Sequence, residues 1–346
     1  MIIHKYPILN KFFAIVFILT INVACMDNLQ DDVRMETLPI PEGIKVGQVE
    51  LGASYTQNAY YNLDNNRVVK TGTIYDYDLA FESTPEGWHI LLNSSRFMHA
   101  ANSQSKDFDE IASAAGLDMN FDSSSGSLDS TAVGNWLRIN GNDTVFKKQV
   151  YVVDLGFDEL GNTLGYKKVI FENLSSGIYT LRHANLDGSE DFTSKVSKNA
   201  DVNLIGFTFD SGGTAVNIEP PAENWQLFFG QYTTLLFAGE EPYPYLVRGV
   251  LRNRDGVQAG LYEGEKSFSD FNYEDALAMV FPKAVDGIGH DWKYYNLEAG
   301  FYAVESEKVY VIRNADGEFF KMHFLSYFNN EGQTGYPQFE FKKLSN

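Results

Sequence analysis

The side chains that could carry out chemistry in this sequence form none of the common catalytic motifs. The chain lacks the G-x-S-x-G pattern of serine hydrolases, the G-x-x-x-x-G-K-[ST] phosphate loop, the H-E-x-x-H pattern of zinc proteases and any cysteine pair for zinc. The acidic runs 107–110 and 185–191 lack the ligand spacing of a calcium-binding EF-hand loop. The 46 Asp and Glu residues supply so many chance carboxylate pairs that such pairs carry no information. The sequence therefore predicts a protein that is not an enzyme.

The single cysteine, Cys25, is better explained as an attachment point than as a reactive or disulfide-forming residue. Residues 1–11 carry two lysines and no acid, and the next 13 residues carry no charge. A run of this length suits the core of a signal peptide and is too short to span a bilayer. Ala24 followed by Cys25 resembles the bacterial lipoprotein box, in which the cysteine is lipidated, although Asn22 replaces the usual aliphatic residue. We predict a signal peptide over 1–24; an ordinary signal peptide with an incidental cysteine is the alternative.

The segment that follows the cysteine is predicted to be a flexible tether over residues 25–46. It is polar, acidic and interrupted by proline. Acidic residues soon after the cysteine resemble the surface-export signal of Bacteroidetes lipoproteins. No later stretch is apolar for 18 residues, so an acyl group would be the membrane attachment. We expect a protein that is lipid-anchored to the outer membrane and exposed at the cell surface.

Composition indicates a mainly β protein with an acidic surface. Aromatic residues make up 14% of the 346 residues and 29 glycines accompany them, a mixture that favours strands and tight turns. The length suits about two domains of about 150 residues each. Loss of 1–24 would change the formal net charge from −19 to −21. This charge argues against a nucleic acid partner.

Two blocks of sequence recur in the same order. Residues 61–82 align with 209–230 at a constant offset of 148 residues, with apolar residues matching apolar residues. The second block runs from a tryptophan to an alternating strand, a glycine turn and another strand. Its first copy contains VGNW, VYVVD and Gly161, and its second contains IGHDW, VYVIR and Gly317. We interpret this as a tandem duplication, with antiparallel β domains at 47–205 and 206–346.

Local patterns predict antiparallel strands and two short helices. Residues 309–328 alternate between apolar and polar types around Asp316 and Gly317, a strong hairpin signal. Further strands are expected at 245–253 and 87–95. Helical spacing is present over 108–117 and 269–281, which occupy equivalent places in the two halves.

The second half resembles a known family. The combination of W-x-L-x-F at 225–229, the strand pair VYVIRNADGEFFKMHFLSYF and the terminal GYPQFEFKKL at 335–344 is similar to the HmuY family. These proteins are haem-binding surface lipoproteins of Bacteroidetes that act as haemophores. The likeness is clear over 206–346 and fainter over 47–205. It implies an all-β fold that clamps haem between loops through two axial His or Met side chains.

The resemblance also implies where the axial ligands should lie. One family ligand lies between the two strand blocks, and the other follows the tryptophan that precedes the final hairpin. In this sequence the second position falls at Asn296 and Leu297, and neither residue ligates haem iron as His or Met does. Met279 lies in the intervening region and His290 lies two residues before Trp292, so they form the preferred pair. The weaker alternatives are Met98, His99 and Met119.

The resemblance therefore implies capture of haem or another flat porphyrin and its transfer to an outer-membrane receptor. A second interpretation keeps the scaffold but not the haem ligands. The protein would then be a non-catalytic surface module that binds protein or glycan, with exposed aromatic residues in 240–246 as the contact surface.

Overall fold

The structure is a computed structural model that describes residues 41–141 and 143–345. The predicted signal peptide, Cys25 and residues 25–40 of the predicted tether lie outside the described residues. The tether prediction is wrong for residues 44–46, which begin the first strand. The described residues all belong to one structural unit, which spans 40–346. In the described part of the chain, no helix is long and apolar enough to cross a membrane.

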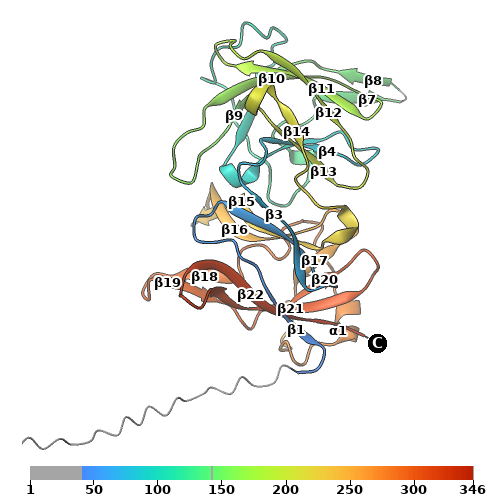
Figure 1. Cartoon of the computed structure of the whole chain (residues 1–346), viewed down its shortest axis with the longest axis vertical. Helices are drawn as coiled ribbons and strands as arrows, with labels where there is room; N and C mark the ends of the chain where they lie inside the picture. The colour runs from blue at the N-terminus through green and yellow to red at the C-terminus, as the bar shows by residue number, and fades with distance from the viewer. Residues whose placement is uncertain (1–40, 142, 346) are drawn as a thin grey trace, which may run out of the picture. The chain divides into compact units, whose positions relative to one another are not determined.

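Regular alternation of apolar residues produces two β-sandwiches, each with its own apolar core (Figure 1). The first sandwich pairs a five-stranded sheet of order β12-β11-β10-β9-β6 with a four-stranded sheet of order β14-β13-β4-β5, and the two-stranded β7-β8 accompanies it. Its strands are β4 (Leu79–Glu82), β5 (Ile90–Leu92), β6 (His99–Asn102), β7 (Leu137–Asn140), β8 (Asp143–Phe146), β9 (Val150–Asp154), β10 (Tyr166–Ser175), β11 (Ile178–Asn185), β12 (Phe192–Ser197), β13 (Leu204–Thr208) and β14 (Thr214–Val216).

The second sandwich repeats this plan. A five-stranded sheet of order β1-β22-β21-β20-β17 packs on a four-stranded sheet of order β16-β15-β2-β3, and the two-stranded β18-β19 accompanies them. Its strands are β1 (Ile44–Gln48), β2 (Gln57–Asn62), β3 (Arg67–Thr73), β15 (Leu227–Ala238), β16 (Glu241–Arg252), β17 (Gln258–Leu261), β18 (Lys293–Asn296), β19 (Phe301–Val304), β20 (Tyr310–Arg313), β21 (Phe319–Phe328) and β22 (Thr334–Lys343).

The helical segments are short. One α-helix, α1, spans Tyr273–Leu277 within the described residues, and four 3-10 turns occur at η1 (Ser94–Arg96), η2 (Leu128–Ser130), η3 (Asp210–Gly212) and η4 (Ala222–Asn224). The described chain is thus mainly antiparallel β, as predicted, and the hairpin of β20 and β21 turns at Gly317 with a φ of 85°.

The first sandwich is formed by the continuous run of strands β4 to β14, whereas the second is formed by β1 to β3 together with β15 to β22. Strands β1 to β3 belong to the second sandwich, where β1 pairs with β22 and β2 pairs with β15. Strands β12 to β14 belong to the first sandwich, where β12 pairs with β11 and β13 pairs with β4. In Figure 1 the blue β1 accordingly lies with the red β21 and β22.

The strand orders of the two sandwiches therefore correspond when β1 to β11 are matched with β12 to β22. β1 begins at Ile44 and β12 at Phe192, the offset of 148 found in the sequence. Tandem duplication as the origin of this order stays a prediction, as does a domain boundary between 205 and 206. The cores divide the chain differently, because residues 44–73 pack with the second half and the 192–216 strands with the first.

Equivalent buried side chains reinforce the correspondence. Trp136 precedes β7 and Trp292 precedes β18, and each is 1% exposed. Lys168 of β10 and Lys321 of β21 are each the third residue of their strand, and both are buried. Each lysine crosses to a loop rather than to an acid.

These lysines explain the outcome of the helix predictions. The ammonium of Lys168 donates to the carbonyls of Phe108 (2.9 Å) and Ile111 (3.0 Å). Those are carbonyls that a helix would need for its own i to i+4 bonds. The predicted helix over 108–117 is accordingly wrong, and in the other half α1 starts only at Tyr273, beyond the segment whose carbonyls Lys321 binds.

Polar contacts join the two sandwiches. Gln231 and Thr233 of β15 donate to the carbonyls of Ser95 and Ser94, at 2.8 and 2.6 Å. Elsewhere the side chains of Asn203 and Asn253 are hydrogen-bonded at 2.9 Å, and both residues are buried. The outer faces of β4 and β15 therefore lie close enough to enclose a cavity.

Candidate functional site

Met279 lines a surface cleft of about 770 Å³, here called the Met279 cleft. The cleft is formed by residues around the end of β17 and the segment after α1. Apolar side chains stand in water at its edge, with Val280 92% exposed and Leu261 36% exposed. The volume falls in the range of about 300–1,000 Å³ typical of pockets for drug-sized ligands. The cleft is therefore large enough for a flat, apolar ligand.

Local sequence fixes the backbone that presents Met279. Asn272 caps α1 through a reciprocal capping box with Asp275. Lys321 donates to the carbonyls of Phe268 and Phe271, the second at 2.8 Å, and so ties the start of this segment to β21. Met279 is half-buried at the edge of a small apolar cluster around Phe271. Its thioether is thus held at a surface rather than within a core.

His290 lies beside a second pocket of about 230 Å³ that shares Leu261 and Gly287 with the Met279 cleft. Its position is set by Gly289, whose backbone N–H and carbonyl bond to Val250 of β16 at 3.1 and 2.8 Å. Gly289 has a φ of 68°, a conformation that favours glycine. The sequence GIGH therefore places the imidazole beside the second pocket.

The imidazole of His290 is suited to metal coordination in its neutral form. Burial lowers its pKa, and Nε2 lies 3.1 Å from the carboxylate of Asp291. A neutral imidazole whose Nε2 carries the proton has its lone pair on Nδ1. Among the described residues, no group of three or more His, Cys, Asp or Glu is arranged to hold a bare metal ion.

The weaker candidates occupy different surroundings. Met98 is 1% exposed in the core of the first sandwich, and its sulfur accepts a hydrogen bond from Arg96 at 3.3 Å. His99 is half-buried, and its Nδ1 lies 2.9 Å from the carbonyl of Phe97. Met119 is half-buried in the segment that bridges to β6 through Asn120 and Ala100. Only His99 and Met119 present side chains near the surface.

The family's second ligand position lies on the hairpin of β18 and β19. Asn296 ends β18, and its side chain accepts hydrogen bonds from the backbone N–H groups of Glu298 and Ala299 at 3.0 Å each. Leu297 at the tip is 87% exposed. Asn296 thus shapes the turn, and Leu297 offers an apolar side chain to solvent.

Exposed aromatic residues gather on this hairpin and on the neighbouring one formed by β15 and β16. Burial raises the pKa of Tyr302 of β19, and nearby tyrosine hydroxyls that include that of Tyr245 of β16 add to this effect, so the two hairpins lie close together. Large apolar side chains that face water on the two hairpins are Leu235, Phe237, Tyr243, Tyr245, Tyr294, Tyr295, Leu297 and Phe301. A patch of this kind is typical of a binding surface.

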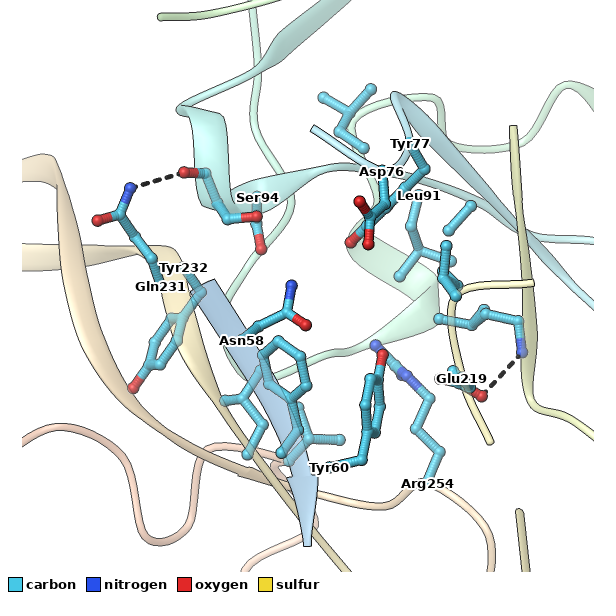
Figure 2. A pocket seen from close by; sticks show the side chains of 18 of the residues that line it. Asn58, Tyr60, Asp76, Tyr77, Leu91, Ser94, Glu219, Gln231, Tyr232 and Arg254 are labelled. Carbon is cyan, nitrogen blue, oxygen red and sulfur yellow. Dashed lines mark hydrogen bonds between the residues drawn. The ribbon is translucent and has the colours of Figure 1, made fainter. Parts of the chain in front are cut away.

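A separate cavity of about 120 Å³ lies between the two sandwiches (Figure 2). It is lined from the second sandwich by Asn58 and Tyr60 of β2, and from the first by Tyr77. Glu219 and Arg254 add a carboxylate and a guanidinium from segments that follow β14 and β16. The rings of Tyr60 and Trp225 meet edge to face at 4.8 Å and form part of its apolar wall.

Burial perturbs the acids around this cavity. Glu219 is 8% exposed, and burial raises its pKa to about 7, although its carboxylate accepts backbone N–H bonds from Asn203 and Leu204 at 3.0 and 3.3 Å. Burial likewise raises the pKa of Asp122 to about 6. Sequence reasoning missed this cavity because its residues come from distant segments, and no local spacing joins Asn58 to Glu219 or Arg254.

The fold and its ligand-sized cleft are those of an all-β binding protein. The family model described as HmuY protein matches residues 54–341, most of the chain, and the chain belongs to the HmuY family. No curated protein matches the sequence significantly.

Solved structures also align with the chain at low identity. Apo PinO from Porphyromonas gingivitis is 8% identical and aligns over 87% of this chain and 97% of that one, with a TM-score of 0.26. The apo HmuY analog TFO from Tannerella forsythia is 10% identical over 88% of this chain and 96% of that one, with a TM-score of 0.19. A protein from Bacteroides vulgatus, proposed to be HmuY-like and heme-binding, is 15% identical over 51% of this chain and 91% of that one, with a TM-score of 0.19.

Proposed function

We propose that this HmuY-family protein binds haem in the Met279 cleft, with Met279 and His290 as axial ligands. The observation that carries the proposal is the cleft itself, which combines a ligand-sized volume, exposed apolar edges and a half-buried thioether. His290 lies beside the adjoining pocket, and burial favours its neutral form. Thioether sulfur and neutral imidazole nitrogen are both suitable haem ligands.

The protein's own residues would supply binding and orientation, without a catalytic step. Bound haem would supply the redox-active iron. Val280 and Leu261 would cover part of the apolar macrocycle, because burying apolar area is favourable by about 25 cal/mol per Å². The protein would be anchored through Cys25 at the outer-membrane surface, where it captures haem and passes it to a receptor.

Haemin titration of the chain from residue 26 onward tests the proposal, because that chain contains the whole unit 40–346. We expect a saturable, shifted Soret band in both oxidation states. Absence of such a band with the wild-type chain would overturn haem binding.

Two double variants then separate the ligand pairs. Met279→Ala with His290→Ala should abolish the shifted band, whereas His99→Ala with Met119→Ala should leave it unchanged. The reverse result would assign the ligands to the first sandwich. A band that survives both double variants would show that the ligand assignment is wrong while haem binding stands.

A second candidate function is non-catalytic binding of protein or glycan by the two aromatic hairpins. It is favoured by the exposure of Tyr243 and Tyr245 near the start of β16. Tyr243→Ala with Tyr245→Ala should then abolish retention on a glycan or host-protein array without changing the haemin titration. Retention that is equal for the wild-type and variant chains would contradict this candidate.

A further inference from the structure

The cavity between the sandwiches contains buried polar groups whose hydrogen-bonding capacity is unused. Asn58 is 9% exposed and Tyr60 is 7% exposed. Within residues 41–141 and 143–345, neither the Asn58 amide nor the Tyr60 hydroxyl makes a hydrogen bond. Both side chains line the same cavity as Arg254 (Figure 2). Among the described residues that line the cavity, the indole Nε1 of Trp225 is buried without a hydrogen-bond partner. Buried polar groups are nearly always paired, so this donor indicates a polar occupant.

The two charged groups in the cavity also lack partners of opposite charge. Glu219 and Arg254 each influence the pKa of the other, yet in the described part of the chain neither has an oppositely charged atom within ion-pair distance. Arg254 donates one hydrogen bond from Nη1, to the carbonyl of Gly126 at 2.7 Å. Glu219 is buried and Arg254 is half-buried, and a charge shielded from water without a counter-ion is costly. A ligand that presents both signs of charge would neutralise both residues at once.

The second arginine that lines the cavity is already occupied. Arg252 donates to four backbone carbonyls, those of Lys283, Ala284, Asn253 and Val257. Asp76 likewise accepts hydrogen bonds from the backbone and hydroxyl of Thr73, at 2.9 and 2.7 Å. The available charged groups are therefore one guanidinium and one carboxylate.

The volume of the cavity limits the size of the ligand that it can hold. A cavity of about 150 Å³ accommodates benzene, a molecule of about six heavy atoms. At about 120 Å³ this cavity suits a molecule of a similar number of atoms and excludes a porphyrin. The smallest α-amino acids combine that size with a carboxylate and an ammonium group.

We propose that the cavity between the two sandwiches binds a small zwitterion of the α-amino-acid class, with its carboxylate on Arg254 and its ammonium group on Glu219. The Asn58 amide and the Tyr60 hydroxyl complete the polar contacts, and Trp225 and Phe228 cover the apolar side of the ligand. This proposed amino-acid site is separate from the haem site proposed for the Met279 cleft. It shares none of the residues that line the Met279 cleft.

Isothermal titration calorimetry with glycine, L-alanine and L-serine tests the proposal on the chain from residue 26 onward. We expect saturable binding of at least one of the three. Glu219→Gln and Arg254→Gln should each weaken that binding at least about tenfold, because each removes one charged contact. Glu223→Gln, four residues from Glu219 and exposed, is the matched control and should bind as the wild type does.

Single-charge and neutral probes complete the test. Acetate, methylamine and glycerol should bind at least about tenfold more weakly than the amino acid, because each lacks one or both charges. Binding of none of the three amino acids, equal binding of glycerol, or binding unaffected by both variants would overturn the proposal. So would a crystal structure with the amino acid present that shows only water in the cavity. Near-UV circular dichroism verifies that the variants are folded, and failure of haem binding alone would leave this inference standing.

Discussion

Two lysines, a residue type that is usually exposed, are buried in this protein and have a structural role. Lys168 and Lys321 are buried, and each uses its ammonium to bind the carbonyls of a neighbouring loop. The period-2 pattern of β21 puts Phe320, Met322 and Phe324 on one face, and all three lie in the core of the second sandwich. It could not predict that Lys321, on the opposite face, would be covered as well, because the covering loop comes from about 50 residues earlier.

Glu219 provides a prediction at this scale. Its pKa is raised from an ordinary value of 4.5 to about 7 because it is buried, so the native protein holds this proton more tightly than the unfolded chain does. The stability that follows is fully present below pH 4.5 and is lost as the pH rises through about 7. Glu219→Gln does not titrate, so its free energy of unfolding relative to wild type should increase by on the order of 3 kcal/mol between pH 4.5 and pH 8.

Urea unfolding at a series of pH values measures this difference. Glu223→Gln, which changes an exposed glutamate four residues away, is the matched control. A Glu219→Gln curve that stays parallel to the wild-type curve from pH 4.5 to pH 8 would contradict the assignment of a raised pKa.

At the scale of elements, strands were predictable and short helices were not. The strand predictions at 150–154 and 245–253 are matched by β9 and β16, because alternation and β-branched residues are local properties. The helix prediction at 108–117 failed because Lys168 takes the carbonyls of Phe108 and Ile111. The 87–95 strand is shortened to β5, since η1 follows with Asn93 as its cap.

For the candidate ligands as well, the local sequence predicts some properties, and others depend on residues that are distant in the sequence. The positions of Met279 and His290 beside adjoining pockets agree with the sequence preference for this pair, but which residues ligate iron stays a prediction. The core position expected for Met98 in RFMHA is confirmed, because Met98 packs among strands of the first sandwich.

The edge strand β16 supports a prediction at this scale. It lies at the edge of its four-stranded sheet, and Pro242 and Pro244 pair with Phe237 and Leu235 of β15. Proline lacks an N–H, so at these edge positions it removes donors that another strand could use. The double variant Pro242→Thr with Pro244→Thr should therefore associate in a concentration-dependent way, as measured by sedimentation velocity.

A matched control is Pro282→Thr, an exposed proline outside the strands. It should remain in the same state as the wild type. Sedimentation that is identical for the edge variant and the wild type at all concentrations would show that these prolines do not protect the edge.

At the scale of the whole molecule, the exchange of strands is the main feature that the sequence did not reveal. The offset of 148 residues indicated two similar units, and the natural expectation was two consecutive domains. Pairing of β1 with β22 and of β12 with β11 shows that, of the two corresponding sets β1 to β11 and β12 to β22, each sandwich takes three strands from one and eight from the other. Periodicity cannot show this, because it identifies strands but not their partners.

Cutting the chain between β11 and β12 tests the exchange. Residues 187–191 are exposed, so a protease site inserted after Gly188 should be cleaved in the native protein. The two fragments should stay together on gel filtration, because strands of both sandwiches lie on both fragments. A denaturing gel should show two pieces.

Fragments that elute separately under native conditions would contradict this arrangement. A second protease site between β7 and β8, at Gly141, serves as a control, because that cut lies within a two-stranded hairpin and should leave the pieces together in either case.

The pairing of β1 with β22 has a consequence for biogenesis. Ile44 lies opposite Lys342, so one of the first described strands to be synthesised has a partner that is among the last. The second sandwich cannot close until the ribosome has released almost the entire chain, and such long-range closure is slow. A chaperone that binds the nascent polypeptide would therefore bind it while β1 to β3 are not yet paired with the later strands of the second sandwich.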